Sequence, residues 1–244
     1  MTIPKESPPL AKGKKKFRFK NKLLSLDAST IELCSTLFDW ARFQEINEAV
    51  KLHLLLDHEG YLLIFASITE GAVHEVNIAH DLSFSKGSIL AIDRGYTDYS
   101  FLSRWTDSGV YFVIRQKDNA SYEVVEKRKV PQNRRVLKDE IITLSGYYAK
   151  KHCPHLLRRI EVDDLENNRV MVFLTNHLEF GATTIARIYQ DHWQIEIFFK
   201  TLKQNLKIKT LVGTSQNALF IQIPRALITI LLLKYLQFQS TLSW

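Results

Sequence analysis

The chain contains few cysteines, the residues that form the disulfides of small secreted proteins and bind zinc in zinc-stabilised ones. Its 244 residues include two cysteines, Cys34 and Cys153, which lie far apart and form no CxxC pair. This composition excludes a disulfide framework and a zinc site built from cysteine pairs, and it indicates thiols in a reducing compartment. Because no apolar region follows the charged N-terminal residues, we predict no secretory signal.

Long hydrophobic runs are also lacking. The most apolar run, residues 226–233, is bounded by Arg225 and Lys234 and is shorter than the roughly 20 residues of a membrane span. We therefore expect no membrane association and interpret the run as part of a core helix over residues 216–238. With 45% hydrophobic residues, the chain can bury one substantial core, as one domain or a domain with an insertion.

Beyond its first residues, the chain has no net charge. Residues 1–22 hold eight Lys or Arg and one acidic residue, and removing them from totals of 33 and 26 leaves 25 of each sign. The basic segment can bind phosphates non-specifically, or it can be a solvated arm, and we expect disorder over residues 1–13. From Lys14 onward, the alternation of Phe17 and Phe19 with basic residues predicts a first strand that leads to Asp27.

Short apolar runs separated by turns predict a mixed α/β fold. Asp57 and Glu59 lie in a DHEG turn between two such runs, so we assign them to a hairpin and not to chemistry. A helix is expected over residues 97–108, and further strands within residues 116–180. The other predicted strands cover residues 16–27, 49–57, 61–69, 88–93 and 110–115.

Residues 188–209 have the periodicity of an amphipathic helix with one chemically unusual face. Intervals of three and four residues bring a set of polar side chains together, with Glu196 between a titratable ring and two ammonium groups. Surface ion pairing, such as Glu196 with Lys200 at about 0.2–0.5 kcal/mol, is the simpler explanation of this face. The set is Tyr189, His192, Glu196, Lys200 and Lys203.

The spacing from Tyr189 through His192 and Glu196 to Lys203 resembles the Tyr-Arg-Glu-Lys signature of bacterial DDE transposases of the "insertion sequence four" type. Histidine stands where that signature has arginine. The neighbouring words WQIE, FFK, LKQ and LKIK also resemble this family. Asp93, in DRGY after an apolar run, resembles the second acidic motif of the family. Asp27, in LSLDAST with LFDWA following, resembles the first.

The resemblance implies that Asp27, Asp93 and Glu196 are catalytic carboxylates and metal ligands. Three converging carboxylates repel one another unless cations balance them. Carboxylate oxygens suit Mg²⁺ or Mn²⁺, and two such ions can clamp the attacking and leaving oxygens of a phosphodiester displacement. The implied contacts to DNA come from Tyr189, His192, Lys200 and Lys203. His74 and Glu75, in AVHEVNIA, also resemble a family motif, and we interpret them as structural residues or as supports around the ligands, not as catalytic residues.

The family's fold would be ribonuclease H-like, formed by residues 14–115 and 181–244, with a β-rich insertion at residues 116–180. The implied activity is metal-dependent cleavage and strand transfer at the ends of an insertion sequence. The implied partners are double-stranded DNA and a second copy of the chain, in the bacterial cytoplasm and with the nucleoid, without a small-molecule cofactor. The resemblance covers residues 12–240, and we expect this sequence to lack the N-terminal DNA-binding region and the last helices that are usual in the family.

Departures from the family pattern keep other interpretations open. Arginine is always charged and grips phosphate with two bonds, whereas histidine is charged only below about pH 6.5. We therefore expect weak DNA-end binding, which His192→Arg would raise. Pro224 interrupts the last predicted helix, at a cost of about 3 kcal/mol.

Two functions other than an active transposase remain open. The first is a truncated, impaired DNA-binding remnant. The second is a protein that uses its basic tail and amphipathic helix for protein contacts.

Overall fold

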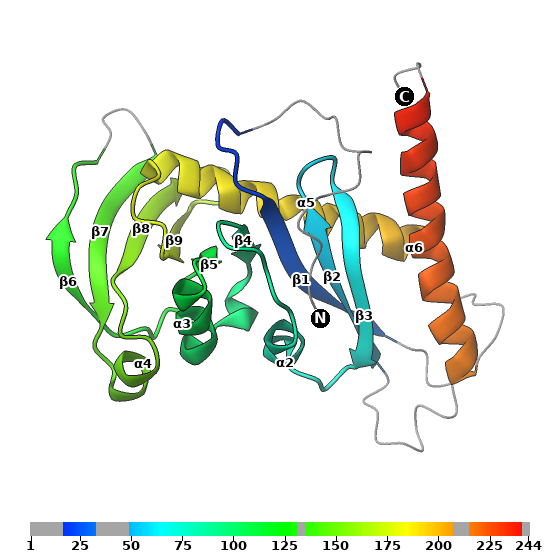
Figure 1. Ribbon diagram of the computed structural model, residues 1–244, viewed down its shortest axis with the longest axis horizontal. Coiled ribbons are helices and arrows are strands. Elements are labelled where there is room, and N and C mark those ends of the chain that lie inside the picture. Colours follow the sequence, from blue (N-terminus) through cyan, green and yellow to red (C-terminus); the bar gives the residue numbers. More distant parts are fainter. Residues whose placement is uncertain (1–16, 33–48, 131–134, 207–214, 241–244) are drawn as a thin grey trace.

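The computed structural model describes residues 17–32, 49–130, 135–206 and 215–240. Within these ranges, nine strands form one curved mixed sheet in the order β3-β2-β1-β4-β5-β9-β8-β7-β6 (Figure 1). The strands are β1 (Leu23–Glu32), β2 (Ala49–Asp57), β3 (Leu62–Glu70), β4 (Ile89–Ile92), β5 (Tyr111–Arg115), β6 (Tyr122–Lys127), β7 (Val136–Leu144), β8 (Leu157–Asp164) and β9 (Arg169–Thr175). The helices are α2 (Glu75–His80), η1 (Arg94–Tyr96), α3 (Tyr99–Asp107), α4 (Tyr147–His152), α5 (Ala182–Leu206) and α6 (Gln216–Gln239).

Strands β2 and β3 form the hairpin that the sequence predicts, since they pair antiparallel. In the connecting turn, the Asp57 carboxylate accepts the backbone N–H of Glu59 at 2.8 Å. Lys22 lies 3.4 Å from the same carboxylate. Gly60 has a φ of 85°, which glycine adopts at little cost. The predicted hairpin at Asp57 and Glu59 is confirmed.

The first strand is displaced from its predicted position. It begins at Leu23, not near residue 16, and continues past Asp27 to Glu32. The residues before it are held by other contacts: Asn21 donates to the carbonyl of Gly87 at 2.6 Å. Phe17 stacks on Phe19, whose ring in turn stacks on Phe180. The alternation of aromatics and bases therefore reflects an aromatic stack, and residues 1–13 lie outside the described residues.

The segment predicted as a β-rich insertion, residues 116–180, contributes β6 to β9 and α4. It does not form a separate layer, because β9 pairs antiparallel with β5 and continues the sheet. The outer strands bury a two-bond ion pair, in which Arg158 Nη2 lies 2.6 Å from Asp139 Oδ2. Both partners are buried, so each balances the charge of the other, and either charge would be costly to bury unpaired.

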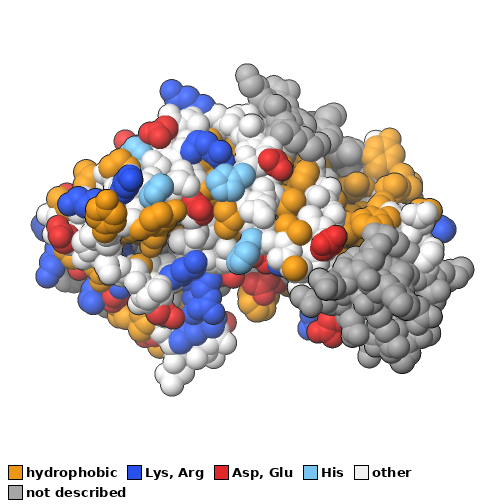
Figure 2. Space-filling model, turned by 90° about the horizontal axis from the view of Figure 1, so that it is seen from below, with side chains coloured by type: hydrophobic (Ala, Val, Ile, Leu, Met, Phe, Trp, Pro, Cys, Tyr) orange, Lys and Arg blue, Asp and Glu red, His pale blue; other side chains and the backbone are white. Residues whose placement is uncertain are grey.

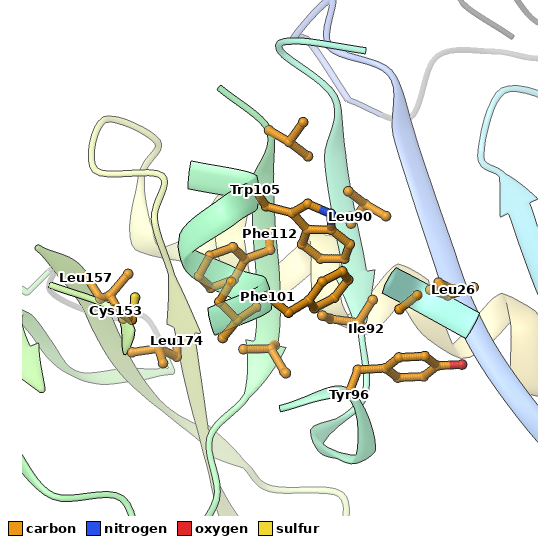
Figure 3. Packing of buried hydrophobic residues seen from close by; sticks show 14 of the residues in the cluster. Leu26, Leu90, Ile92, Tyr96, Phe101, Trp105, Phe112, Cys153, Leu157 and Leu174 are labelled. Carbon is orange, nitrogen blue, oxygen red and sulfur yellow. The ribbon is translucent and has the colours of Figure 1, made fainter. Parts of the chain in front are cut away.

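The two faces of the sheet follow the alternation of side chains along each strand. Even-numbered positions of β4, such as Leu90 and Ile92, pack with Phe101 and Trp105 of α3 in one cluster (Figure 3). Odd-numbered positions, such as Ile89, pack on the opposite face with residues of α5. As Figure 1 shows, α5 crosses one face of the sheet, while α2, α3 and α4 lie on the other side. Any residue that continues the odd series of β1 or β4 therefore faces α5.

Helix α6 is only partly a core helix. Leu219, Ile223 and Leu227 are buried in a cluster with β2 and α5. The segment Asn217–Gln237 is 21 residues long, and its most apolar window has a mean hydropathy of 1.7 with 17% of that window buried, so by length and composition this helix could cross a membrane. Apolar core helices have the same composition, so this property by itself assigns no membrane. The helix continues through Pro224.

Candidate functional site

Asp27 lies on β1, and Asp93 directly follows β4, the adjacent parallel strand. Leu26 of β1 pairs with Ile92 of β4, so each aspartate is the next residue along its strand direction. Adjacent strands lie about 4.8 Å apart. Both aspartates also continue the odd-numbered series of their strands, so both belong to the α5 face. The topology therefore brings together two carboxylates that are 66 positions apart in the sequence.

Asp93 does not serve as a simple helix cap. It precedes the 3₁₀ turn η1, but its side chain makes no capping hydrogen bond there. Its Oδ1 instead accepts the hydroxyl of Tyr189 at 3.1 Å. The Tyr189 ring packs between Phe173, at 4.7 Å between centroids, and His192, at 5.6 Å. Tyr189 thus orients the Asp93 carboxylate from α5.

The three predicted acids influence one another electrostatically. The pKa of Asp27 is raised from 3.8 to about 7, chiefly by burial and further by repulsion from Asp93 and Glu196, despite a bond from the Ala28 N–H. The pKa of Glu196, on α5, is raised by partial burial and by repulsion from Asp93, against an attraction to Arg169. The acids therefore share a region of negative charge that a cation would neutralise.

Carboxylate oxygens are the donors that Mg²⁺ and Mn²⁺ prefer, so the chemistry of this set fits those ions. Among the residues that the structure describes, no three His, Cys, Asp or Glu side chains stand close enough together to hold a metal ion. Asp27, Asp93 and Glu196 therefore fit such an ion by donor type and by charge, but they do not stand close enough together in this structure to hold one.

Glu75 is a fourth carboxylate near this site, and the sequence analysis did not include it among the candidates. It adds to the repulsion that raises the pKa of Asp27. Lys51 of β2 lies 2.9 Å from Glu75 Oε1, and this pairing lowers the pKa of Glu75 despite partial burial. The AVHEVNIA segment was the signal available in the sequence, and there Glu75 forms an ion pair with Lys51.

His192 lies in the interior, which argues against its interpretation as a DNA contact. Its exposed fraction is 2%. Its Nδ1 lies 3.1 Å from the hydroxyl of Ser25 on β1. Burial lowers the pKa of the ring from 6.5 to about 4, against the attraction of Asp93. A neutral, enclosed imidazole is not available to a phosphate, so the predicted gain from His192→Arg loses its basis.

Lys200 and Lys203 are exposed on α5 beyond Glu196, as a contact to a polyanion requires. Trp193, on the same helix, is 57% exposed. The molecular surface seen from below the view of Figure 1 carries Lys and Arg side chains scattered among acidic, histidine and hydrophobic ones (Figure 2). This mixture agrees with the balanced charge of the chain after residue 22.

Comparison with known proteins points to one family. The family described as "Transposase DDE domain" matches residues 18–232. A protein of Sinorhizobium fredii named transposase y4zB is 28% identical over 86% of this chain and 59% of its own length. The "Probable transposase for insertion sequence element IS5377" of Geobacillus stearothermophilus is 29% identical over 93% of this chain and 60% of its own length. The chain thus spans about three fifths of these curated relatives.

Among solved structures, the piggyBac transposase in its synaptic complex with hairpin DNA is similar in fold. The TM-score is 0.50 with 13% sequence identity, over 88% of this chain and 47% of the piggyBac chain. At this identity the similarity is evidence for the fold alone. It agrees with the nine-stranded mixed sheet and its flanking helices.

Proposed function

The chain belongs to the transposase DDE domain family, and on this basis we propose that it catalyses DNA strand cleavage and strand transfer at the ends of an insertion sequence. Asp27, Asp93 and Glu196 are the catalytic carboxylates of this proposal. The observation that carries it is the register of β1 and β4, which sets the two aspartates side by side on the face covered by the Glu196 helix. The strand order β3-β2-β1-β4-β5 supports a ribonuclease H-like core.

The same three carboxylates would hold the divalent ions, Mg²⁺ or Mn²⁺ and two in number, that the family resemblance implies. When bound, such ions stabilise charge on the attacking and leaving oxygens of a phosphodiester. The chain's own residues prepare that site. Tyr189 holds the Asp93 carboxylate through its hydroxyl, and Lys51 holds Glu75 beside it.

Contact with DNA is assigned to the exposed side chains of α5. Lys200 follows Glu196 by one helical turn, and Lys203 follows Lys200 by three residues, so both lie toward the same side of the helix. Both are exposed. Ammonium groups beside an acidic site attract the phosphates of a duplex, with an affinity that falls as salt rises. A second copy of the chain on DNA and a location with the nucleoid in the bacterial cytoplasm complete the proposal.

The proposal is tested with oligonucleotides that carry the terminal repeats flanking this reading frame. In Mn²⁺, the wild-type chain should nick the transposon end, and Asp93→Asn should abolish nicking. Asp118→Asn is the matched control, because Asp118 is exposed near η1 and is 3.9 Å from Arg94. Nicking by Asp93→Asn at the wild-type rate would remove Asp93 from the site. Binding of the ends without nicking by wild type would favour the impaired DNA-binding remnant instead.

A further inference from the structure

A closed chain of hydrogen bonds joins α5 to β1 beside the three carboxylates. Asp191 Oδ2 accepts from His58 Nδ1 at 2.6 Å, and His58 Nε2 lies 2.7 Å from Ser25 Oγ. The Ser25 hydroxyl also lies 3.1 Å from Nδ1 of His192, and Tyr61 donates to Asp191 at 3.2 Å. Asp191 and His192 are consecutive residues of α5. The series of hydrogen bonds therefore starts on α5, runs through the β2–β3 turn and β1, and ends on α5.

The order Asp191, His58, Ser25 is that of a serine nucleophile with its base and orienting carboxylate. Burial excludes that function here. Ser25 has an exposed fraction of 0% and Asp191 of 2%. The hydroxyl is also occupied by two imidazoles, so no substrate carbonyl can approach it. The arrangement therefore acts within the protein and not on a substrate.

Two residues of this hydrogen-bond chain, Ser25 and His192, each lie a short distance before a proposed metal ligand on the same element. Ser25 precedes Asp27 by two residues on β1, and both belong to the face toward α5. His192 precedes Glu196 by four residues on α5, about one turn. Two residues of strand advance about 6.7 Å and four residues of helix about 6 Å. The Ser25–His192 bond is therefore a cross-link between β1 and α5, and Asp27 and Glu196 follow it along the same two elements.

Small side chains let the helix approach the sheet at the Ser25–His192 bond. Ser25 pairs in register with Ala91 of β4, and both are fully buried. A seryl and an alanyl side chain leave room for the His192 ring above them. Larger residues at these positions would lift α5, and Glu196 with it, away from the two aspartates.

We propose that the Asp191–His58–Ser25–His192 chain is a positioning device that fixes the height and rotation of α5 over β1 and so the placement of Glu196 relative to Asp27. Its consequence for metal binding rests on the proposed function, whereas the restraint on α5 does not. Ser25, His58 and Asp191 are positioning residues on this account. When residues that orient the ligands of a metal ion are replaced, the affinity for the metal typically falls by about 10–100-fold.

The first test compares Mn²⁺ binding by the full chain and its variants, followed by the electron paramagnetic resonance signal of free Mn²⁺. Asp191→Asn and Ser25→Ala should each weaken binding about tenfold. Asp139→Asn is the matched control, since it makes the same change at a buried aspartate that accepts hydrogen bonds from Arg158 in the outer strands. It should lower the melting temperature and leave Mn²⁺ affinity unchanged.

Unchanged Mn²⁺ affinity in both Asp191→Asn and Ser25→Ala, with melting temperatures lowered as in the control, would overturn the proposal. Ser25→Ala decides the matter should Asp191→Asn fail to fold, because it removes one hydroxyl and leaves no unpaired charge. If Asp93→Asn binds Mn²⁺ as wild type does, the proposed function fails, while the restraint on α5 remains open to a direct test.

That direct test is metal-free. Spin labels at Thr30 of β1 and Lys200 of α5, both exposed, report the distance between the two elements in a background with Cys34→Ser and Cys153→Ala. The wild-type distribution should be narrow. Asp191→Asn and Ser25→Ala should broaden or shift it, and Asp139→Asn should not. Identical distributions in wild type and in both variants would show that the hydrogen-bond chain does not position α5.

Discussion

Replacing Asp27 with asparagine should stabilise the metal-free protein at alkaline pH, although it removes a proposed metal ligand. The pKa of Asp27 is raised from 3.8 to about 7, chiefly by burial and then by Asp93 and Glu196. Each pH unit between those two values corresponds to about 1.4 kcal/mol, so keeping this carboxylate ionised costs the fold about 4 kcal/mol. Because the side chain is half-buried, solvent screening reduces the expected cost to about 2 kcal/mol.

Proton binding by Asp27 determines whether stability rises or falls with pH. A carboxyl with a raised pKa binds its proton more tightly in the folded state, so stability falls as pH rises from 3.8 to about 7 and is level above that. An asparagine does not titrate, and its Oδ1 can still accept the Ala28 N–H. Between pH 5 and pH 8, the wild type should therefore lose about 1 to 2 kcal/mol relative to Asp27→Asn. Urea unfolding in EDTA measures the difference.

Metal should reverse the order of stability. Mn²⁺ at 100 times its dissociation constant would stabilise the wild type by about 2.7 kcal/mol, and it should leave Asp27→Asn almost unchanged. Asp118→Asn, which removes an exposed charge, controls for net charge. Parallel curves of stability against pH for wild type and Asp27→Asn between pH 5 and pH 8 would refute the raised pKa of this carboxylate.

Three further variants test the interior. His192→Arg should lower the melting temperature and give no gain in DNA-end binding at pH 7.5, because it buries a fixed cation; tighter binding without lost stability would contradict the enclosed position of His192. Leu54→Ala should cost about 2–5 kcal/mol in urea unfolding, since Leu54 is fully buried against α5 and α6, whereas the exposed Leu165 should tolerate the same change. Pro224→Ala should raise stability by about 1–3 kcal/mol by restoring a helical N–H, and a thermal melt without an increase would show that α6 accommodates the proline.

Local patterns predicted much of the sheet because alternation along a strand depends on nearby residues. The predicted strand at 49–57 coincides with β2, and the hairpin at Asp57 follows from its turn residues. The first strand was misplaced because the contacts that decide it are distant. Asn21 bonds to Gly87, and Phe19 stacks on Phe180. No window of sequence contains those partners, so the alternation of Phe17 and Phe19 was ambiguous.

Helix periodicity likewise predicted which side chains of α5 share a face, but not which part of that face is covered. His192 and Glu196 are one turn apart, yet His192 is enclosed and Glu196 is exposed. The difference arises where α5 meets Ser25, 167 positions from His192. A spacing rule treats both residues alike because it contains no information about the surface that packs against the helix.

By itself, the sequence determined the residue types of the candidate site. It supplied one aspartate in an alternating segment, one after an apolar run and a glutamate on an amphipathic helix, because residue type and local periodicity are properties of short segments, and the family resemblance singled out these three. Only the tertiary structure decided that β1 and β4 lie in adjacent parallel register, that β9 attaches the predicted insertion to β5, and that His192 belongs to a buried chain with Ser25, His58 and Asp191. These depend on pairings between distant segments, whose free energy comes from the burial and hydrogen bonds they share.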